Sequence, residues 1–274
     1  MHGVLGAGHN LRSLAKKLSD ARTDYRFVLI DLRYHGKSVG APPPHHLESC
    51  VDDLLDLADA LGQAPRVVIG HSLGGKVALA YGKRQEVALE GYRTSTAESR
   101  AALRQVWTLD SDPGAQEPGG NHQVQQVLGA LLTHRGPFSS REEAVGALLS
   151  AGHSSGLANW LVTSLDRKPD GYHWRFELDH IVDLLKDYFA LDYWPYLEHV
   201  AQQGLTTGVL YELLVADQSD RWSGSMKDRA ARLAQEPSDP RRGRVQVHTL
   251  PNSGHWVHVD NPEGLQQILL DHLV

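Results

Sequence analysis

Several features are scarce or absent in this sequence, and each absence excludes a class of protein. Cys50 is the single cysteine, so no intramolecular disulfide can form and an oxidising compartment has left no mark. The 27 basic and 33 acidic residues give a net charge of −6, which provides no general attraction to nucleic acid or to an anionic membrane. No segment approaches the ~20 apolar residues that a bilayer span requires. We therefore predict no nucleic-acid partner and no membrane span.

Signals for metal or phosphate binding are also missing. The chain has 16 histidines, but the pair His45 and His46 has no carboxylate or thiol at ligand spacing, so we predict no metal site. A phosphate-binding loop of the form G-x-x-x-x-G-K-[ST] does not occur. The first twenty residues lack the apolar core of a secretory signal, and leucines at positions 11, 14 and 18 predict a surface helix there. A transit peptide is the alternative interpretation of this acid-poor start.

Short apolar segments alternate with helical patterns over the first 110 residues. Phe27–Ile30, Val67–Ile69 and Val106–Leu109 have the composition of buried strands. Apolar residues at helical spacing predict an amphipathic helix over Leu47–Leu61, and Leu73–Tyr81 reads as a second helix. Because continuous apolar strands alternate with helices, we predict an α/β fold with a mostly parallel sheet and helices on both faces.

The alternation stops after residue 112 and resumes after residue 204. The segment between is helix-like and aromatic, with few strand-like runs. Strand patterns return at Val209–Val215 and Val245–Leu250, followed by a helical pattern over Pro262–Leu273. We therefore predict a sheet domain in two parts, residues 1–112 and 205–274, interrupted by a helical lid insertion at residues 113–204.

The clearest chemical motif is Gly70–Gly74, with the sequence GHSLG, which matches G-x-S-x-G. It follows an apolar strand directly and precedes a helix directly, which is the context of a nucleophile elbow. Flanking glycines allow the tight turn, and the helix N-terminus favours a developing anion. The motif predicts that Ser72 is a nucleophile.

A serine nucleophile needs a base, which is usually a histidine oriented by a carboxylate. His255 follows the last predicted strand in the turn Asn252–Trp256, which is the chain order and the sheet edge expected of the base. We predict that His255 is the general base, with His258 as the alternative.

The negative charge that develops during attack requires two backbone N–H donors. One is expected from Leu73, the residue after the nucleophile. The other is expected from the loop at His2–Gly6, with the N–H of Val4 as the donor. The alternative is that these first residues form a flexible tail.

Four segments together carry a resemblance to a known family: His2–Gly6, Asp31–Ser38, Gly70–Lys76 and Asn252–His258. They resemble the α/β-hydrolase superfamily, and within it a branch of small esterase-like enzymes with bacterial, mitochondrial and plastid members. The likeness extends over essentially the whole chain, and some segments look closest to plant and algal members. It implies a Ser–His–acid mechanism on small acyl esters or thioesters, without a cofactor.

The resemblance leaves three candidates for the acid. Asp110 ends the strand after the elbow, a position that some members of the branch use. Asp220 follows the penultimate strand, the commoner position in the superfamily, but relatives often have Ser-Pro or Ser-Asn where this chain has Ser219 and Asp220. Asp179 lies in a segment that resembles the branch's insertion. Asp110 is the preferred candidate, and the other two remain alternatives.

The leading functional hypothesis is a serine hydrolase that cleaves a carboxylic ester or thioester through an acyl-enzyme, with the lid forming the acyl pocket. A different class of function is also open, namely a hydrolase-fold protein that binds a ligand or partner without catalysis. A third hypothesis keeps the triad for C–C bond hydrolysis or perhydrolysis.

The start of the chain motivates the second hypothesis. In the fold that the resemblance implies, a central strand precedes the His2–Gly3 loop and lies between the strands at Phe27–Ile30 and Val67–Ile69. We therefore expect either that Met1 is not the natural start or that the two flanking strands close together. The expected compartment is reducing, either the cytoplasm or, with a targeting segment, a plastid or mitochondrion.

Overall fold

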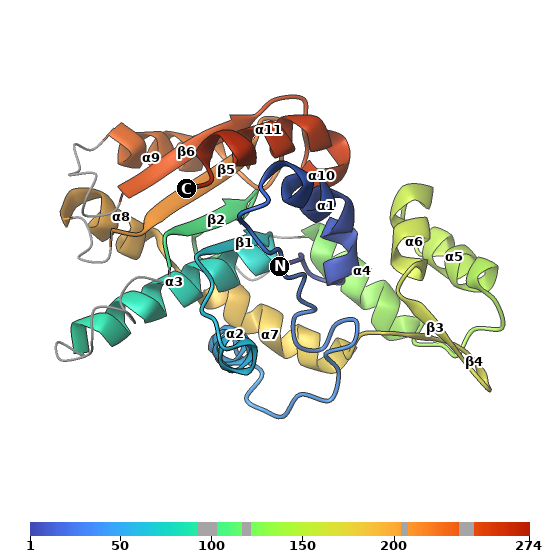
Figure 1. Cartoon of the computed structure of the whole chain (residues 1–274). Helices are drawn as coiled ribbons and strands as arrows, with labels where there is room; N and C mark the ends of the chain where they lie inside the picture. The colour runs from blue at the N-terminus through green and yellow to red at the C-terminus, as the bar shows by residue number, and fades with distance from the viewer. Residues whose placement is uncertain (92–102, 117–121, 204–207, 236–243) are drawn as a thin grey trace.

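The computed structural model describes residues 1–91, 103–116, 122–203, 208–235 and 244–274. Within these ranges, β-strands are β1 (Val67–His71), β2 (Gln105–Leu109), β3 (Leu165–Lys168), β4 (Gly171–Trp174), β5 (Leu210–Ala216) and β6 (Arg244–Leu250). The helices are η1 (Gly8–Leu11), α1 (Arg12–Ala21), α2 (Leu47–Leu61), α3 (Leu73–Gly91), α4 (His122–Thr133), α5 (Arg141–Ser150), α6 (Ser155–Val162), α7 (Leu178–Ala190), α8 (Trp194–Gln203), α9 (Gly224–Gln235), α10 (Val257–Asp260) and α11 (Pro262–His272). Figure 1 shows their arrangement.

The main sheet is parallel and has the strand order β1-β2-β5-β6. Its register places Val67 opposite Gln105, and Gln105 opposite Leu210. Four of the predicted strands thus form one parallel sheet, and the prediction of an α/β fold is confirmed. Because all four strands run in the same direction, the segments that follow them meet at one edge.

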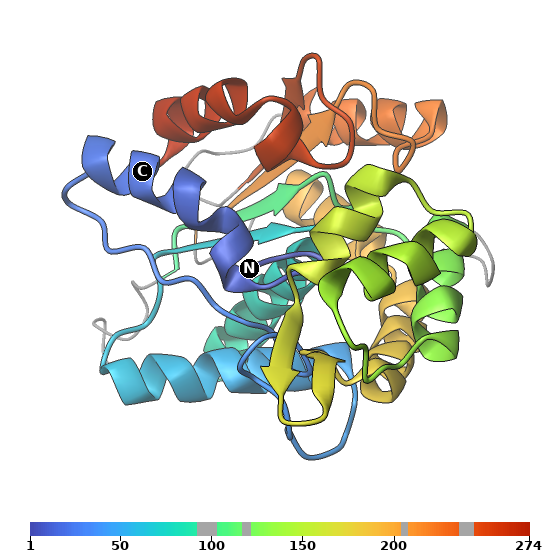
Figure 2. The ribbon, with the colours of Figure 1, turned by 90° about the vertical axis from the view of Figure 1, so that its right-hand side faces the viewer.

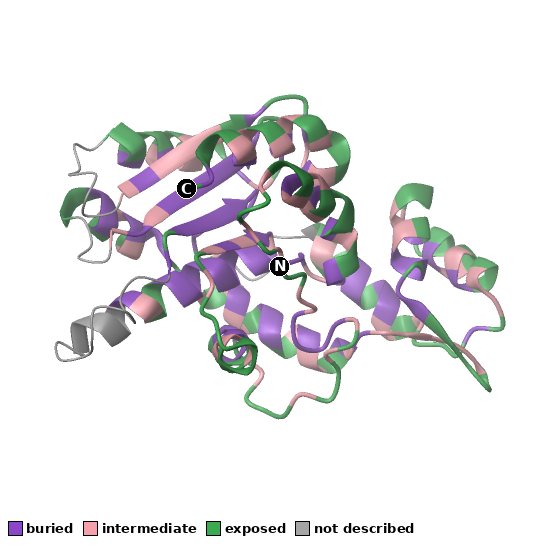
Figure 3. Ribbon diagram, in the orientation of Figure 1, coloured by how far each residue is buried: buried purple, intermediate pink, exposed green. Residues whose placement is uncertain are grey.

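Side chains of the central strands alternate between two apolar clusters. On β2, Val106 packs in the larger cluster with α2 and α3, whereas Trp107 packs in the smaller cluster with α1 and α11. The same alternation on β5 places Leu213 and Leu214 in different clusters. Figure 3 shows that β2 and β5 are buried along most of their length. Helices therefore cover both faces of the sheet, as the continuous apolar strands predict.

Between residues 122 and 203 the structure is mainly helical, as predicted, but it also contains the antiparallel hairpin β3–β4. The sequence does not signal this hairpin, because β3 is largely exposed and charged. Figures 1 and 2 show α4, α5, α6 and the hairpin beyond the carboxyl ends of the parallel strands. The predicted lid boundary at 204–205 lies outside the described residues, so the division into core and lid stays a prediction. No helix in the described ranges is long and apolar enough to cross a membrane.

The prediction of a strand at Phe27–Ile30 is wrong. These residues have no strand assignment, and Val28 and Leu29 are exposed. A β-rich composition forms a strand only when a neighbouring strand accepts its backbone hydrogen bonds. Here a groove separates Phe27–Ile30 from β1. The expectation that these two segments close together is therefore wrong.

Candidate active site

Ser72 lies in the turn between β1 and α3, with its backbone at a φ of +52°, a conformation that is uncommon for a residue with a side chain. The turn is too tight for side chains on either flank. A Cβ on Gly70 would lie 1.9 Å from the carbonyl oxygen of Gly74, and a Cβ on Gly74 would lie 2.7 Å from the carbonyl oxygen of His2. Glycine is required at both positions, and the strained turn exposes Ser72 at the sheet edge, as expected of a nucleophile elbow.

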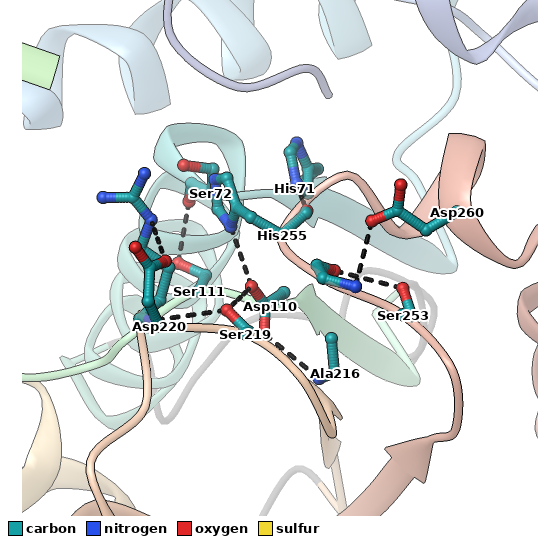
Figure 4. Close-up of polar contacts among 12 residues, drawn as sticks. His71, Ser72, Asp110, Ser111, Ala216, Ser219, Asp220, Ser253, His255 and Asp260 are labelled. Atoms are coloured by element: carbon teal, nitrogen blue, oxygen red, sulfur yellow. Dashed lines mark hydrogen bonds and ion pairs between the residues drawn. The ribbon is translucent and has the colours of Figure 1, made fainter. Parts of the chain in front are cut away.

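His255 and Asp110 are joined directly, as Figure 4 shows. His255 lies in the loop after β6, and its Nδ1 donates to Oδ2 of Asp110 across 2.7 Å. Asp110 is fully buried at the end of β2, and its Oδ1 also accepts the N–H of Ala216. Because Nδ1 carries the proton, Nε2 of His255 can accept one, and no partner occupies it among the described residues.

The other candidates for acid and base make no hydrogen bond to this pair in the described part of the chain. Asp220 is exposed and makes an ion pair with Arg221. Asp179 is exposed and makes a bidentate ion pair with Arg135. His258 packs its ring against His71, 5.4 Å between centroids, and burial lowers its pKa. The structure therefore brings Asp110, and not Asp220 or Asp179, to His255.

The first residues of the chain pack against the elbow and do not form a loose tail. A Cβ on Gly3 would lie 3.1 Å from Cβ of Ser72, so the His2–Gly3 backbone touches the nucleophile. The N–H groups of Val4 and Leu73 have no hydrogen-bond partner in the part of the chain that the structure describes. Both predicted N–H donors are therefore free of hydrogen bonds within the described residues. Leu73 directly follows Ser72 in the sequence, and Val4 follows Gly3, which contacts Ser72 in the fold.

Two buried histidines hold this loop in place. His2 Nε2 accepts the N–H of Leu32 at 2.9 Å, and His35 Nε2 accepts the N–H of Leu5 at 3.1 Å. Burial lowers the pKa of His2 well below its ordinary value and lowers the pKa of His35 to about 4. Both rings are thus neutral at pH 7, which is the state in which Nε2 can accept.

Three further residues support the site, and the sequence reasoning did not assign them a role. Ser219 donates its hydroxyl to Oδ2 of Asp110 at 2.6 Å, and His71 donates from Nε2 to the carbonyl oxygen of His255 at 2.7 Å. Lys76 is fully buried, and its ammonium donates to the carbonyl oxygens of Gly114, Tyr188 and Leu191. The Ser-Pro and Ser-Asn pairs of the resembling branch share their serine with Ser219 of this chain, and that was the available signal.

The helical segment reaches the site through one aromatic pair. Trp160 of α6 lies against Trp256, the residue after His255, with 4.7 Å between ring centroids. A cavity of about 10 Å³ remains between these rings, His71 and the His2–Gly3 backbone. Such a volume is about that of one water. This cavity is too small to hold more than a water-sized group.

In the described ranges no three histidine, cysteine or carboxylate side chains converge as metal ligands. The described residues bring together a serine hydroxyl on a tight turn, an imidazole that hydrogen-bonds a buried carboxylate, and two backbone N–H groups without partners.

Comparisons with known proteins identify the family. Residues 1–267 match the sequence model of the alpha/beta hydrolase family. The sn-1-specific diacylglycerol lipase ABHD11 of Mus musculus is 27% identical over 280 residues, which cover 100% of this chain and 79% of the mouse protein. Esterase YbfF of Escherichia coli is 23% identical over 273 residues, 100% of this chain and 91% of the bacterial one.

Among solved structures, a marine microorganism esterase superimposes with a TM-score of 0.75 and 24% identity, covering 100% of this chain and 93% of that chain. At that identity the superposition is a likeness of fold. Together with the family match over nearly the whole sequence, it leads to one conclusion. The chain belongs to the alpha/beta hydrolase family and is a hydrolase enzyme.

Proposed function

We propose that this protein is a serine hydrolase that cleaves a carboxylic ester or thioester through a Ser72–His255–Asp110 triad. The observation that carries the proposal is the 2.7 Å hydrogen bond between His255 Nδ1 and the buried carboxylate of Asp110, beside a serine on a strained strand-to-helix turn. A buried carboxylate fixes the imidazole tautomer and stabilises the imidazolium that forms during attack.

In the first half of the reaction, Oγ of Ser72 attacks the acyl carbonyl carbon while His255 Nε2 takes the hydroxyl proton. The carbonyl oxygen becomes an oxyanion, and the N–H groups of Val4 and Leu73 stabilise it. The leaving alcohol or thiol then receives the proton from His255, which leaves an acyl-enzyme on Ser72.

In the second half, water replaces the alcohol or thiol. His255 removes a proton from water, the resulting hydroxide attacks the acyl carbonyl, and the oxyanion again occupies the two backbone donors. Collapse breaks the bond to Oγ, and His255 returns the proton to Ser72. The products are a carboxylic acid and the free serine.

No direct hydrogen bond joins Ser72 Oγ to His255 Nε2 in the described part of the chain. Catalytic hydrogen bonds are often long in a free enzyme and tighten when substrate is bound. The proposal therefore expects this hydrogen bond to form when substrate is bound.

The relatives support an acyl substrate. The mouse relative is named as a diacylglycerol lipase and the bacterial one as an esterase, and both names describe enzymes that cleave carboxylic esters. The apolar rings of Trp160 and Trp256 beside the site suit an acyl chain better than a charged group.

Labelling with a fluorophosphonate probe tests the nucleophile. We expect covalent labelling of the wild-type protein, no labelling of Ser72→Ala, and normal labelling of Ser155→Ala, a matched control at an exposed serine of the lid. A folded, monodisperse wild-type protein that does not react would instead support a hydrolase-fold binding protein without catalysis.

A substrate panel then tests the reaction. We expect turnover of acyl esters or acyl thioesters, with faster reaction of the better leaving group, and none of β-diketones. Turnover of β-diketones with no ester activity would mean that the same triad serves C–C bond hydrolysis, and peroxide-dependent product would indicate perhydrolysis.

A further inference from the structure

His255 lies in a connection that has neither strand nor helix structure. Residues 251–256, here called the His255 turn, join β6 to α10, and Asn252 within them has a φ of +53°, in the left-handed region. Such a segment lacks the repeated hydrogen bonds of a strand or a helix. The position of the His255 ring therefore depends on which groups bind the N–H and C=O groups of this turn.

Two aspartates bind consecutive N–H groups just before His255. The N–H of Ser253 donates to Oδ1 of Asp217 at 3.1 Å. The N–H of Gly254 donates to Oδ2 of Asp260 at 2.9 Å, and the dashed line at Asp260 in Figure 4 marks this bond. Asp217 directly follows β5 and Asp260 ends α10, so the turn is held from two different segments of the chain. Hydrogen bonds to an ionised acceptor are stronger than those between neutral groups.

A third bond ties the turn to the residue before the proposed nucleophile. Nε2 of His71 donates to the carbonyl oxygen of His255 at 2.7 Å, and the two rings lie 4.7 Å apart between centroids. Burial lowers the pKa of His71 well below its ordinary value, so this ring is neutral at pH 7 and adds no positive charge beside His255. Because Ser72 directly follows His71, the bond fixes the turn relative to the elbow.

Both aspartates are exposed, and among the described residues neither makes a hydrogen bond to a side chain of the proposed triad. A Cβ on Gly254 would lie 3.2 Å from Oδ2 of Asp260, so a glycine at this position permits the close approach of the carboxylate. The N–H of Ser253 lowers the pKa of Asp217 below its ordinary value, which favours the ionised form. Exposed carboxylates contribute little to core packing, so their effect on this region comes through the turn.

We propose that Asp217 and Asp260 are positioning residues, which hold the His255 turn from two sides and so keep Nδ1 of His255 at the carboxylate of Asp110. That carboxylate is fully buried and has other donors of its own, so it does not follow a shifted ring. A displacement of about 1 Å at a catalytic group can lower a rate about a hundredfold. The effect on catalysis rests on the proposed function, whereas the effect on the placement of the ring does not.

A purely structural role is the alternative, in which the two carboxylates only stabilise the fold. Such a role would lower the melting temperature but would leave the His255 ring, and kcat of the folded protein, unchanged. A positioning role instead changes the environment of Nδ1 and lowers kcat. It changes KM little, because the two side chains act through the turn and not through substrate.

The test compares alanine and asparagine variants of the full chain. Asp217→Ala and Asp260→Ala remove the acceptor, whereas Asp217→Asn and Asp260→Asn keep a side-chain oxygen that can accept the same N–H. A double alanine variant removes both acceptors. The backbone bond from the N–H of Gln218 to the carbonyl oxygen of Ser253, 3.0 Å, involves neither side chain. Asp228→Ala, at an exposed aspartate of α9, is the matched control.

Separate measurements follow the turn, the ring and the reaction. Amide hydrogen exchange is measured at Ser253 and Gly254. The Nδ1 proton of His255 is observed by proton NMR, and its resonance is assigned by its loss in His255→Gln. Values of kcat and KM are measured on one acyl ester, and melting temperatures verify that each variant is folded.

We expect Asp217→Ala to speed amide exchange at Ser253 about fivefold or more. Asp260→Ala should do the same at Gly254. The Nδ1 resonance should broaden in both variants and disappear in the double variant, because a less restrained ring exchanges its proton with water. Each single alanine variant should lower kcat about three- to tenfold, the equivalent of one ordinary hydrogen bond, with KM changed less than about twofold. The asparagine variants should restore most of the loss, and Asp228→Ala should match the wild type.

An unchanged Nδ1 resonance or an unchanged kcat in the double alanine variant would overturn the proposal. Asparagine variants as impaired as the alanine variants would also contradict it, because the acceptor oxygen would then have no role. A wild-type protein without an Nδ1 resonance would mean that the ring is not held at Asp110. Failure of the proposed function is distinguishable: the wild type would turn over no ester, but the alanine variants would still alter the Nδ1 resonance and the exchange of the turn amides.

Discussion

Ser219 and His255 donate to the same oxygen atom of Asp110. Ser219 Oγ lies 2.6 Å from Oδ2, and His255 Nδ1 lies 2.7 Å from it. Asp110 is fully buried and its other oxygen accepts the N–H of Ala216, so its carboxylate is fixed by three donors from two segments, the end of β5 with its following loop and the loop after β6. The precision of the His255 position thus depends on a serine that touches neither the nucleophile nor the base.

Replacing Ser219 by alanine removes a hydrogen bond to a buried charge, an interaction of about 1.5–3 kcal/mol. We expect kcat/KM for an acyl ester to fall about ten- to hundredfold, because the carboxylate can rotate away from His255. Ser219→Thr, which keeps the hydroxyl, should restore most of the rate. Ser223→Ala, at an exposed serine nearby in sequence, serves as the control, and equal losses in both alanine variants would contradict the prediction.

Asparagine substitutions at the three candidate acids should separate them. Asp110→Asn places an amide donor near Nδ1 of His255 and favours the wrong tautomer, so we expect kcat to fall about 10³- to 10⁴-fold. Asp220→Asn and Asp179→Asn should change kcat less than about twofold, since each removes an exposed ion pair. Steady-state kinetics on one ester, with circular dichroism to verify folding, distinguishes the three candidate acids. A larger loss at Asp220 or Asp179 would exclude Asp110 as the acid.

Stability should fall as the pH is lowered from about 6.5 towards 4. Burial lowers the pKa of His2, His35 and His71 below that of an unfolded histidine, with His35 at about 4. In this window the unfolded chain binds more protons than the folded chain. Each of these histidines therefore lowers the free energy of unfolding by up to about 1.4 kcal/mol for each pH unit that the pH falls. The stability that these three histidines contribute is fully present above pH 6.5.

Urea unfolding at pH 7.5 and at pH 5.0 measures this loss. His35→Gln lacks one titrating group, so we expect its free energy of unfolding to be lower at pH 7.5 but to fall less steeply between the two pH values. Asn159→Ala, at an exposed residue without a titrating side chain, is the control and should keep the slope of the wild type. An identical slope for His35→Gln would show that His35 titrates normally.

Truncating Trp160 of the helical segment should widen the substrate range. Trp160→Ala removes the ring that lies against Trp256, so the roughly 10 Å³ cavity gains room for an acyl group. We expect kcat/KM to rise several-fold for long acyl esters and to change little for acetyl esters. Asn159→Ala, an exposed neighbour on α6, should leave the ratio of the two unchanged. A uniform loss for both chain lengths would mean that Trp160 supports folding and does not restrict entry.

The local features of the fold were predictable from sequence. The helix at Leu47–Leu61 has the bounds that its apolar spacing predicts, and Pro262, at the first turn of α11, marks the start of the last helix. The elbow was also recognisable, because strand, glycines, serine and helix are contiguous in the chain. Each of these depends on short-range geometry.

Long-range relationships were not predictable in the same way. Phe27–Ile30 has the composition of a strand, but whether it becomes one depends on a neighbour elsewhere in the chain. The choice among three aspartates depended on which one the fold carries to His255, 145 residues after Asp110. The donation from Ser219 depends on the same packing of β2 against β5.

Lys76 joins the elbow helix to the helical segment by three hydrogen bonds. Its ammonium, four residues after the nucleophile, donates to carbonyl oxygens 38, 112 and 115 residues away. A variant without the helical segment would remove all three of these acceptors from a buried charge. A different segment in this place would therefore need to supply new acceptors, or Lys76 would need to be replaced.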